Sequence, residues 1–93
     1  MDAEEFHRYW RETHAPIAAK LPLLRKYVLN HFAAAPDGTP PVYDGFAELW
    51  WDDAEAMEQS MASAEGQAAM ADGDNFFDVE RIQTFTVDEV KIV

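Results

Sequence analysis

Three side chains of this sequence are suited to proton transfer, and they are predicted to be catalytic. An imidazole titrates near neutral pH, so His14 can take or give a proton inside a cavity, with His31 in a supporting role. Glu48 alternates with Phe46 and Trp50 along one face of a predicted strand. Aromatic neighbours desolvate a carboxylate and raise its proton affinity, which suits a general acid or base. We therefore interpret His14 as the main proton-transfer group.

Each of these residues also has a structural interpretation. His14 could cap a helix that Pro16 interrupts, or it could bond to a backbone carbonyl group. His31 could lie on an ordinary, half-exposed face of a strand. Glu48 could form an ion pair with Arg25, Lys26 or an arginine of a partner chain.

Aromatic side chains are predicted to bind a small hydrophobic or aromatic molecule next to these groups. Four residues offer stacking surfaces of this kind: Tyr9, Trp10, Tyr27 and Trp50. Tyr27 and His31 have even spacing on a strand and therefore share one of its faces. Trp10 lies on an apolar helical stripe, where a place in the core is the favoured structural interpretation.

Neither a metal ion nor an organic cofactor is expected. The chain has no cysteine, which excludes thiolate ligands and disulfides. His7 and His14 are separated by about 10 Å along a helix and cannot share one ion without other ligands. With 4 glycines and no glycine-rich phosphate-binding motif, a dinucleotide site is not expected either.

The charge balance argues against nucleic acid and membranes as partners. The 18 acidic and 7 basic residues give a net charge of −11, which repels phosphate backbones and anionic lipid surfaces. No run of about 18 apolar residues is present to span a bilayer, and no signal-peptide pattern occurs. We therefore expect a cytoplasmic protein.

The length and the apolar content together predict a small domain that associates with itself. A chain of 93 residues is expected to form a single domain, residues 1–93, with a small core. Yet 48% of the residues are hydrophobic and 13% are aromatic. One small core cannot hide all of these side chains, so some should line a pocket or an interface. The sequence thus predicts a homodimer.

A helix over residues 2–20 is predicted to position the first group of functional residues. Four residues at helical spacing form its apolar stripe: Phe6, Trp10, Thr13 and Ile17. Tyr9 and His14 lie on opposite flanks of that stripe. Proline has no backbone N–H, so Pro16 should produce a kink or a new helix start near Ala15.

Three strands are predicted to accompany this helix. Residues 23–34 and 42–51 are rich in aromatic and aliphatic side chains, and a segment dense in turn-forming residues separates them. Residues 82–93 form the last strand, because their side chains divide between two faces of an extended chain. The second and third of these strands are predicted to be separated by helices.

Two helices are predicted between the second and the third strand. Asp52 and Glu55 form a capping box that opens the first of them. Ser63 caps the second, which is predicted over residues 64–71. The Phe76-Phe77 pair in the loop that follows is expected to plug a gap in the core.

Motifs spread over nearly the whole chain resemble those of the EthD family. Any one of them is a weak signal, but their order along the chain makes the set specific. The resemblance rests on Glu5-Phe6-His7-Arg8-Tyr9-Trp10, His14-Ala15-Pro16, Leu21-Pro22, Tyr27, Asn30-His31, Asp44-Gly45-Phe46-Ala47-Glu48-Leu49-Trp50-Trp51-Asp52, Phe76-Phe77-Asp78 and residues 85–93.

The resemblance implies an α+β, ferredoxin-like protomer, with an antiparallel sheet and its helices on one face. Two protomers would pair through their sheets and enclose a cavity, as a dimeric α+β barrel. The family also carries a strand before the first helix, whereas this sequence begins at the helix. We expect a shifted terminal strand or one donated by a partner to fill that place, or a native start further upstream.

The resemblance implies chemistry on small molecules without choosing the reaction. Proteins of this architecture include cofactor-free oxygenases, isomerases, cyclases and haem-degrading enzymes, and the EthD family is associated with ether degradation. We therefore expect a cofactor-free oxidoreductase, or an isomerase or cyclase, acting on a small hydrophobic metabolite in the dimer cavity. The alternatives are a ligand-binding or accessory protein without turnover, and a haem-handling protein with His14 or His31 as axial ligand.

Overall fold

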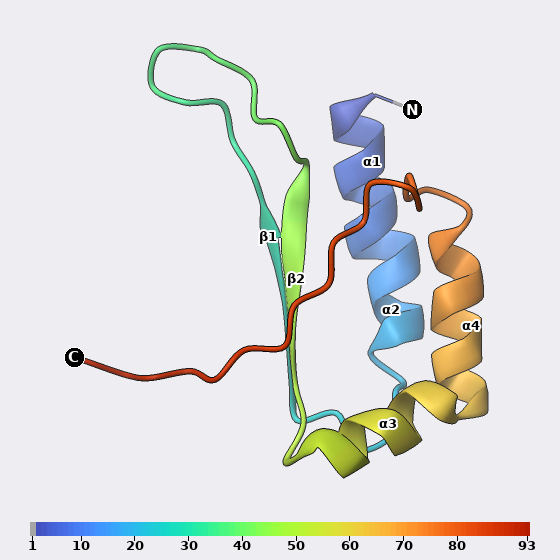
Figure 1. The fold of residues 1–93 in the computed structure, drawn as a ribbon. Coiled ribbons are helices and arrows are strands. Elements are labelled where there is room, and N and C mark those ends of the chain that lie inside the picture. The colour runs from blue at the N-terminus through green and yellow to red at the C-terminus, as the bar shows by residue number, and fades with distance from the viewer. Residues whose placement is uncertain (1) are drawn as a thin grey trace.

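The helices pack on one face of a two-stranded antiparallel sheet (Figure 1). The computed structural model describes residues 2–93, and this arrangement is the α+β class that the sequence predicts. None of the helices in this range combines the length and the apolar character needed to cross a membrane. The elements in chain order are α1 (Ala3–Tyr9), η1 (Trp10–His14), α2 (Ala15–Ala18), β1 (Lys26–His31), β2 (Gly45–Trp50), α3 (Ala54–Ala62) and α4 (Ala64–Gly73).

The first helix contains a π-helical turn immediately before its proline. The Asp2 side chain caps the beginning of α1 by accepting a hydrogen bond from the Glu5 N–H. In η1 the Ala15 N–H donates to the Trp10 carbonyl oxygen, five residues earlier, so the turn holds one residue more than an α-helical turn. A proline ring presses against the carbonyl of the preceding turn, and the wider turn leads directly into Pro16. The new helix start predicted near Ala15 is therefore confirmed.

The π-helical turn changes which residues of the first helix are buried. An α-helix advances by about 100° per residue, so one extra residue in a turn rotates everything after it by that amount. Trp10, His14 and Ala18 are buried, whereas Thr13 is exposed and Ile17 is only half-buried. The prediction that the apolar stripe continues through Thr13 and Ile17 was wrong. His14 lies on the buried face instead of its flank.

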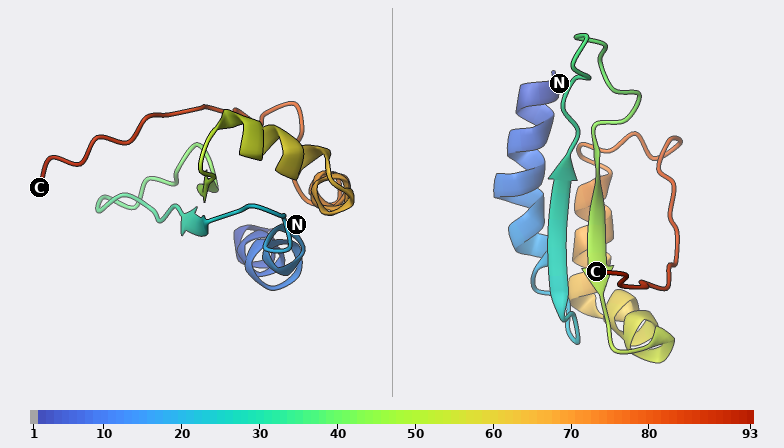
Figure 2. Two further views of the ribbon diagram at one scale, coloured as in Figure 1. Left: turned by 90° about the horizontal axis from the view of Figure 1, so that it is seen from below. Right: turned by 90° about the vertical axis from the view of Figure 1, so that its left-hand side faces the viewer.

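The sheet has one face toward the helices and one face away from them (Figure 2). Tyr27 pairs with Leu49, and His31 pairs with Gly45, in an antiparallel register. The face toward the helices carries five side chains: Tyr27, Leu29, His31, Ala47 and Leu49. The opposite face carries six: Lys26, Val28, Asn30, Phe46, Glu48 and Trp50. This alternation decides which of the predicted functional residues can meet.

The strands and the third helix begin later than the sequence predicts. Leu23 has a φ of 66°, a left-handed conformation that interrupts extended backbone, and β1 begins only at Lys26. The cap of α3 is Asp53, whose side chain accepts a hydrogen bond from the Ala56 N–H. The predicted cap, Asp52, instead binds Arg25 outside the helix. The capping role of Ser63 at α4 is confirmed.

The last predicted strand does not form. Residues 82–93 have no regular secondary structure and no sheet partner in the described chain. They run past the outer side of β2 and then leave the body of the molecule (Figure 2). We call this segment the C-terminal tail. A strand is stable only when its backbone groups find partners in a ladder, and the tail passes β2 without forming one.

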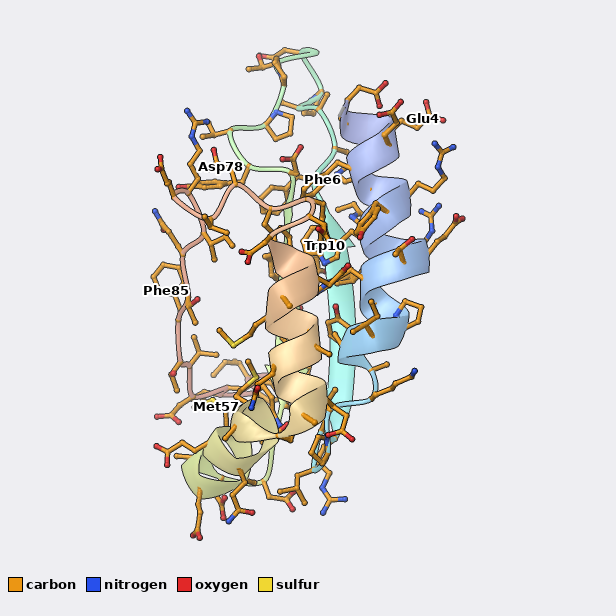
Figure 3. All side chains as sticks on the ribbon, turned by 90° about the vertical axis from the view of Figure 1, so that its right-hand side faces the viewer. Glu4, Phe6, Trp10, Met57, Asp78 and Phe85 are labelled. Carbon is orange, nitrogen blue, oxygen red and sulfur yellow. The ribbon has the colours of Figure 1, made fainter. Side chains whose placement is uncertain are left out.

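An aromatic cluster closes the layer between the helices and the sheet. Phe6 and Trp10 project from the first helix into this layer (Figure 3). The Phe76 ring lies 5.3 Å from the ring of Phe6, 4.8 Å from Tyr9 and 4.8 Å from His14, measured between centroids. Phe77 stacks at 4.0 Å on Phe76. The expectation that this pair fills a gap in the core is confirmed.

Replacing Phe76 by Ala is predicted to remove about 3 kcal/mol from the free energy of unfolding, because it opens a cavity among packed rings. Urea titration followed by tryptophan fluorescence measures this loss. The control is Tyr43→Ala, which removes an aromatic ring that is 46% exposed and lies outside the packed cluster, and it should cost less. Equal costs for the two substitutions would contradict the assignment of Phe76 to the core.

Candidate functional site

A buried carboxylate links His14 and Tyr9. The Nδ1 atom of His14 lies 2.8 Å from Oδ2 of Asp72, and the Tyr9 hydroxyl donates to Oδ1 of Asp72 at 2.7 Å. Asn75 donates a further hydrogen bond to Oδ1 at 3.1 Å. His14 is 7% exposed and Asp72 is 9% exposed, so the network lies inside the helical layer. Its members come from η1, α1, the last turn of α4 and the loop after it.

The charges in this network follow from its hydrogen bonds. Burial raises the pKa of Asp72, but the hydrogen bonds from Tyr9, His14 and Asn75 lower it further, so that the net shift is downward. The hydrogen bond to Asp72 raises the pKa of Tyr9, with burial and the carboxylate charge acting in the same direction. The carboxylate is therefore ionised at neutral pH, and the phenol keeps its proton and donates it.

An ionised Asp72 determines how the His14 ring can act. A carboxylate accepts hydrogen bonds, so it places a proton on the His14 Nδ1 atom that faces it. The Nε2 atom is then the basic nitrogen. The rings of Phe76 and Phe77, at 4.8 Å and 5.5 Å from the imidazole, reduce the local dielectric and strengthen this pairing. The arrangement can hold an imidazole in one orientation, with Nε2 as the nitrogen that can accept a proton.

A second pair of imidazoles lies between the first helix and β1. His31 stacks on His7 with ring centroids 4.3 Å apart, and His7 Nε2 donates to the Asp44 carbonyl oxygen at 2.9 Å. Burial lowers the pKa of His31, and electrostatic interactions with the neighbouring His7 and Arg11 side chains lower it further. His31 is therefore neutral at neutral pH. Within residues 2–93 no three His, Asp or Glu side chains form a group suited to a metal ion.

Trp10 and Tyr27 complete the inner layer next to His31. The Trp10 ring meets the His31 ring edge-on at 5.4 Å, and Gly45 of β2 allows this close approach because a Cβ there would lie 3.1 Å from Trp10. Burial raises the pKa of Tyr27, and the nearby Trp10 indole opposes this shift. The Trp10 Nε1 and His31 Nδ1 atoms are buried without a hydrogen-bond partner in the described chain. Both atoms would gain from a polar ligand atom or a water molecule.

Glu48 and Trp50 lie on the other face of the sheet. Glu48 accepts a hydrogen bond from Asn30 at 2.8 Å, and the Lys26 Nζ atom lies 4.6 Å from the centre of the Trp50 ring. Arg25 pairs with an aspartate, so neither of the predicted basic partners binds Glu48. The predicted site residues thus fall into two groups. Five of them lie in the helical layer, and these two face away from it.

Sequence reasoning missed Asp72 and Asn75. The periodicity of α4 contains a signal for Asp72, because it lies three residues after Ala69 and one before Gly73, and all three are buried. An acidic residue on a buried helix face needs hydrogen-bond donors from other elements. Two of these donors are far from Asp72 in the sequence: His14 lies 58 residues earlier and Tyr9 lies 63 residues earlier. The local pattern of α4 therefore cannot show where they are.

Comparison with known proteins places this fold and these motifs in one family. The model of the EthD domain matches residues 1–80 of the sequence. The chain belongs to the EthD family. The resemblance drawn from the ordered motifs is therefore confirmed, and the EthD match includes every residue of the two groups described above.

Two relatives support the EthD assignment. The crystal structure of an EthD family protein from Bacillus halodurans superposes with a TM-score of 0.68 at 30% sequence identity, covering 81% of this chain and 74% of that one. An uncharacterized 11.0 kDa protein from the thcB–thcC intergenic region of Rhodococcus erythropolis is 28% identical over 88 residues, which is 95% of this chain and 84% of that protein. The α+β fold is thus shared with a solved EthD structure.

Asp72→Asn is predicted to destabilise the protein at neutral pH by about 2 kcal/mol and to weaken its sensitivity to acid. The folded-state pKa of Asp72 lies below that of an ordinary aspartate. Its contribution to stability is therefore fully present above about pH 4 and is lost as the pH falls through the folded-state value. Urea titrations at a series of pH values measure both effects.

The matched control is Asp52→Asn. Arg25 lowers the pKa of Asp52 by a hydrogen bond and by its charge, but this pair is on the surface and contributes little to stability. The control should therefore change the free energy of unfolding only slightly. If Asp72→Asn has an equally small effect, the buried network does not hold the helical layer together.

Proposed function

We propose that this EthD protein is a cofactor-free enzyme in which His14 transfers a proton to and from a small hydrophobic metabolite. The observation that supports this proposal is the 2.8 Å contact between His14 and Asp72 inside an aromatic layer. A carboxylate in this position orients the imidazole and stabilises the imidazolium ion that forms when Nε2 accepts a proton. Tyr9 and Asn75 in turn hold the carboxylate.

The proposed chemistry begins with removal of a proton from the substrate. An isomerase or cyclase returns a proton at another atom after the bonds have rearranged. An oxidoreductase without a cofactor passes electrons from the resulting anion to an acceptor such as molecular oxygen. In each case His14 is the base of the first step, and the substrate supplies the acidic C–H or O–H bond.

The inner layer supplies the groups that would bind such a substrate. Trp10, Tyr9 and Tyr27 present ring surfaces, and His31 is a neutral imidazole whose Nδ1 atom lacks a partner. A small aromatic or carbonyl compound offers both an apolar face and one or two polar atoms. Such a ligand would satisfy the buried nitrogen atoms of Trp10 and His31.

A homodimer is part of the proposal, because the outer face of the sheet is incomplete in one chain. Two strands alone are marginally stable in water, and Phe46 and Phe32 leave apolar surface exposed on or next to this face. Two copies with these faces opposed would enclose a chamber that contains Glu48 and Trp50. Glu48 would then act as an acid or base in this chamber, or pair with a basic group of the second copy.

A ligand-binding protein without turnover is the second candidate. The observation that favours it is the burial of His14, because an imidazole that is 7% exposed can serve mainly to hold Asp72 in place. The two candidates share the binding residues of the inner layer. They differ in whether the His14 Nε2 atom exchanges protons with the ligand.

Proton exchange in heavy water separates these candidates. We predict that the protein exchanges the C–H protons next to the carbonyl group in a panel of small alkyl aryl ketones, followed by loss of their proton NMR signals. His14→Gln should slow this exchange about 100-fold or more, because the base is lost. Asp72→Asn should slow it less and change its pH profile. Tyr43→Phe, on the surface, is the matched control and should leave the rate unchanged.

Two results would contradict the proposal. Binding of a panel compound with the same slow exchange in the unchanged protein and in His14→Gln would favour the ligand-binding candidate. A Soret band during haem titration that disappears in His14→Ala or His31→Ala would favour the haem-handling alternative.

A further inference from the structure

The buried indole N–H of Trp10 is a hydrogen-bond donor that the fold leaves unused. Trp10 is 4% exposed, and its Nε1 atom has no partner among residues 2–93. An indole nitrogen can only donate, so an acceptor atom is needed to satisfy it. A buried donor without an acceptor is destabilising, and a fold that keeps one calls for a functional explanation.

Contacts at the two ends of the Trp10 ring show which way this N–H points. The Cζ3 atom, at the benzene end, faces β2, because a Cβ on Gly45 would lie 3.1 Å from it. The nitrogen atom, at the pyrrole end, lies close to the Tyr27 hydroxyl of β1. Burial raises the pKa of Tyr27, and the indole N–H opposes this rise by favouring a charged oxygen atom. The net shift is upward, so the phenol keeps its proton at neutral pH and is a second donor next to the first.

His14 lies at the same level of the fold as these two donors. The first helix and β1 run in opposite directions, and the stacked rings of His7 and His31 mark a point where the two elements are level (Figure 1). From this point His14 lies about 10 Å along the helix, and Tyr27 lies about 13 Å back along the strand. Trp10 is one turn before His14 on the same buried face. The base and the two donors therefore surround one region of the inner layer.

We propose that the Trp10 indole N–H and the Tyr27 hydroxyl form an oxyanion site for His14, and that the substrate is a ketone or aldehyde with a C–H bond next to its carbonyl group. This inference rests on the proton transfer proposed above and names its substrate class. An ether or a hydrocarbon develops no negative oxygen when it loses a C–H proton. Two donors directed at one oxygen atom stabilise a developing anion more strongly than a neutral carbonyl group.

The proposed step transfers one proton and moves two electron pairs. The Nε2 atom of His14 accepts the proton, and the C–H electron pair becomes the carbon–carbon double bond of an enolate. The π pair of the carbonyl group moves to its oxygen atom, which accepts hydrogen bonds from Trp10 and Tyr27. The imidazolium ion then returns the proton to the same carbon, or to another carbon of a conjugated enolate. The second outcome is an isomerisation, and the cycle balances without an oxidant.

Binding of para-nitrophenol tests the oxyanion site without turnover. Its phenolate resembles an enolate and absorbs at a longer wavelength than the phenol, so absorbance reports which form is bound. We expect the protein to bind the phenolate about tenfold more tightly than the phenol, which lowers the pKa of the bound probe by about one unit. Tyr27→Phe should remove most of this preference, whereas Tyr43→Phe, outside the packed layer, should retain it. A preference that is unchanged in Tyr27→Phe would overturn the oxyanion site.

NMR spectroscopy of the indole N–H groups tests the role of Trp10, because replacing this ring would disturb the core. With nitrogen-labelled tryptophan, we expect para-nitrophenolate to move the Trp10 N–H proton signal downfield and to slow its exchange with water. The Trp50 ring, on the outer face of the sheet, is the internal control and should not respond. A response confined to Trp50 or Trp51 would place the anion elsewhere and would overturn the proposal.

The kinetics of ketone exchange distinguish stabilisation of an enolate from simple binding. Tyr27→Phe should lower kcat for deuterium exchange into an alkyl aryl ketone about 100-fold and change KM less than about threefold, because the lost hydrogen bond is stronger to the enolate than to the ketone. Tyr43→Phe is again the matched control. An increase in KM with an unchanged kcat would show that Tyr27 only holds the ketone, which contradicts the oxyanion role.

Failure of this inference is distinguishable from failure of the proposed proton transfer. Exchange that requires His14 but is unaffected in Tyr27→Phe overturns the oxyanion site and leaves the proton transfer intact. A phenolate preference that disappears in Tyr27→Phe supports the oxyanion site, because it is measured without turnover. If that preference is found in a protein that exchanges no ketone protons, the proton transfer fails and the anion-binding donors remain.

Discussion

The buried carboxylate of Asp72 is the constraint on which the helical layer depends. A carboxylate withdrawn from water is stable only when hydrogen-bond donors surround it. Its donors come from separate segments, namely Tyr9 in α1, His14 in η1 and Asn75 after α4. Bringing them together holds the end of α4 against the first helix, and the π-helical turn before Pro16 puts His14 on the side where the carboxylate lies. The same contacts therefore stabilise the layer and orient the imidazole.

The sheet divides the polar residues of this EthD protein between two environments. The inner face presents imidazole and aromatic rings to the helices, where burial keeps His31 neutral by lowering its pKa. The outer face presents Glu48, Asn30 and the Lys26–Trp50 contact to its surroundings. Because side chains alternate strictly along a strand, no single chamber in one chain can contain both sets. Cooperation between them requires a second copy or a ligand on each face.

The proposed association between copies would have to overcome their charge. Each chain carries a net charge of −11, so two copies repel one another at long range. Apolar surface that is exposed on the C-terminal tail and on the outer face of the sheet would supply the opposing attraction. In such a dimer, stability, association and the shape of any chamber would be coupled, because the core of one chain is small.

The sequence by itself determined the features that depend only on residues close together in the chain. The cap at Ser63, the new helix start at Ala15 and the ordered motifs of the EthD family are local patterns, and the structure and comparisons agree with them. Only the tertiary structure decided the partners of His14, the separation of Glu48 from the imidazoles, and the absence of a strand over residues 82–93. These features depend on contacts between distant segments, such as the pairing of His14 with Asp72, 58 residues away. Local periodicity also missed the π-helical turn, because one extra residue in a turn moves the buried face from Thr13 to His14.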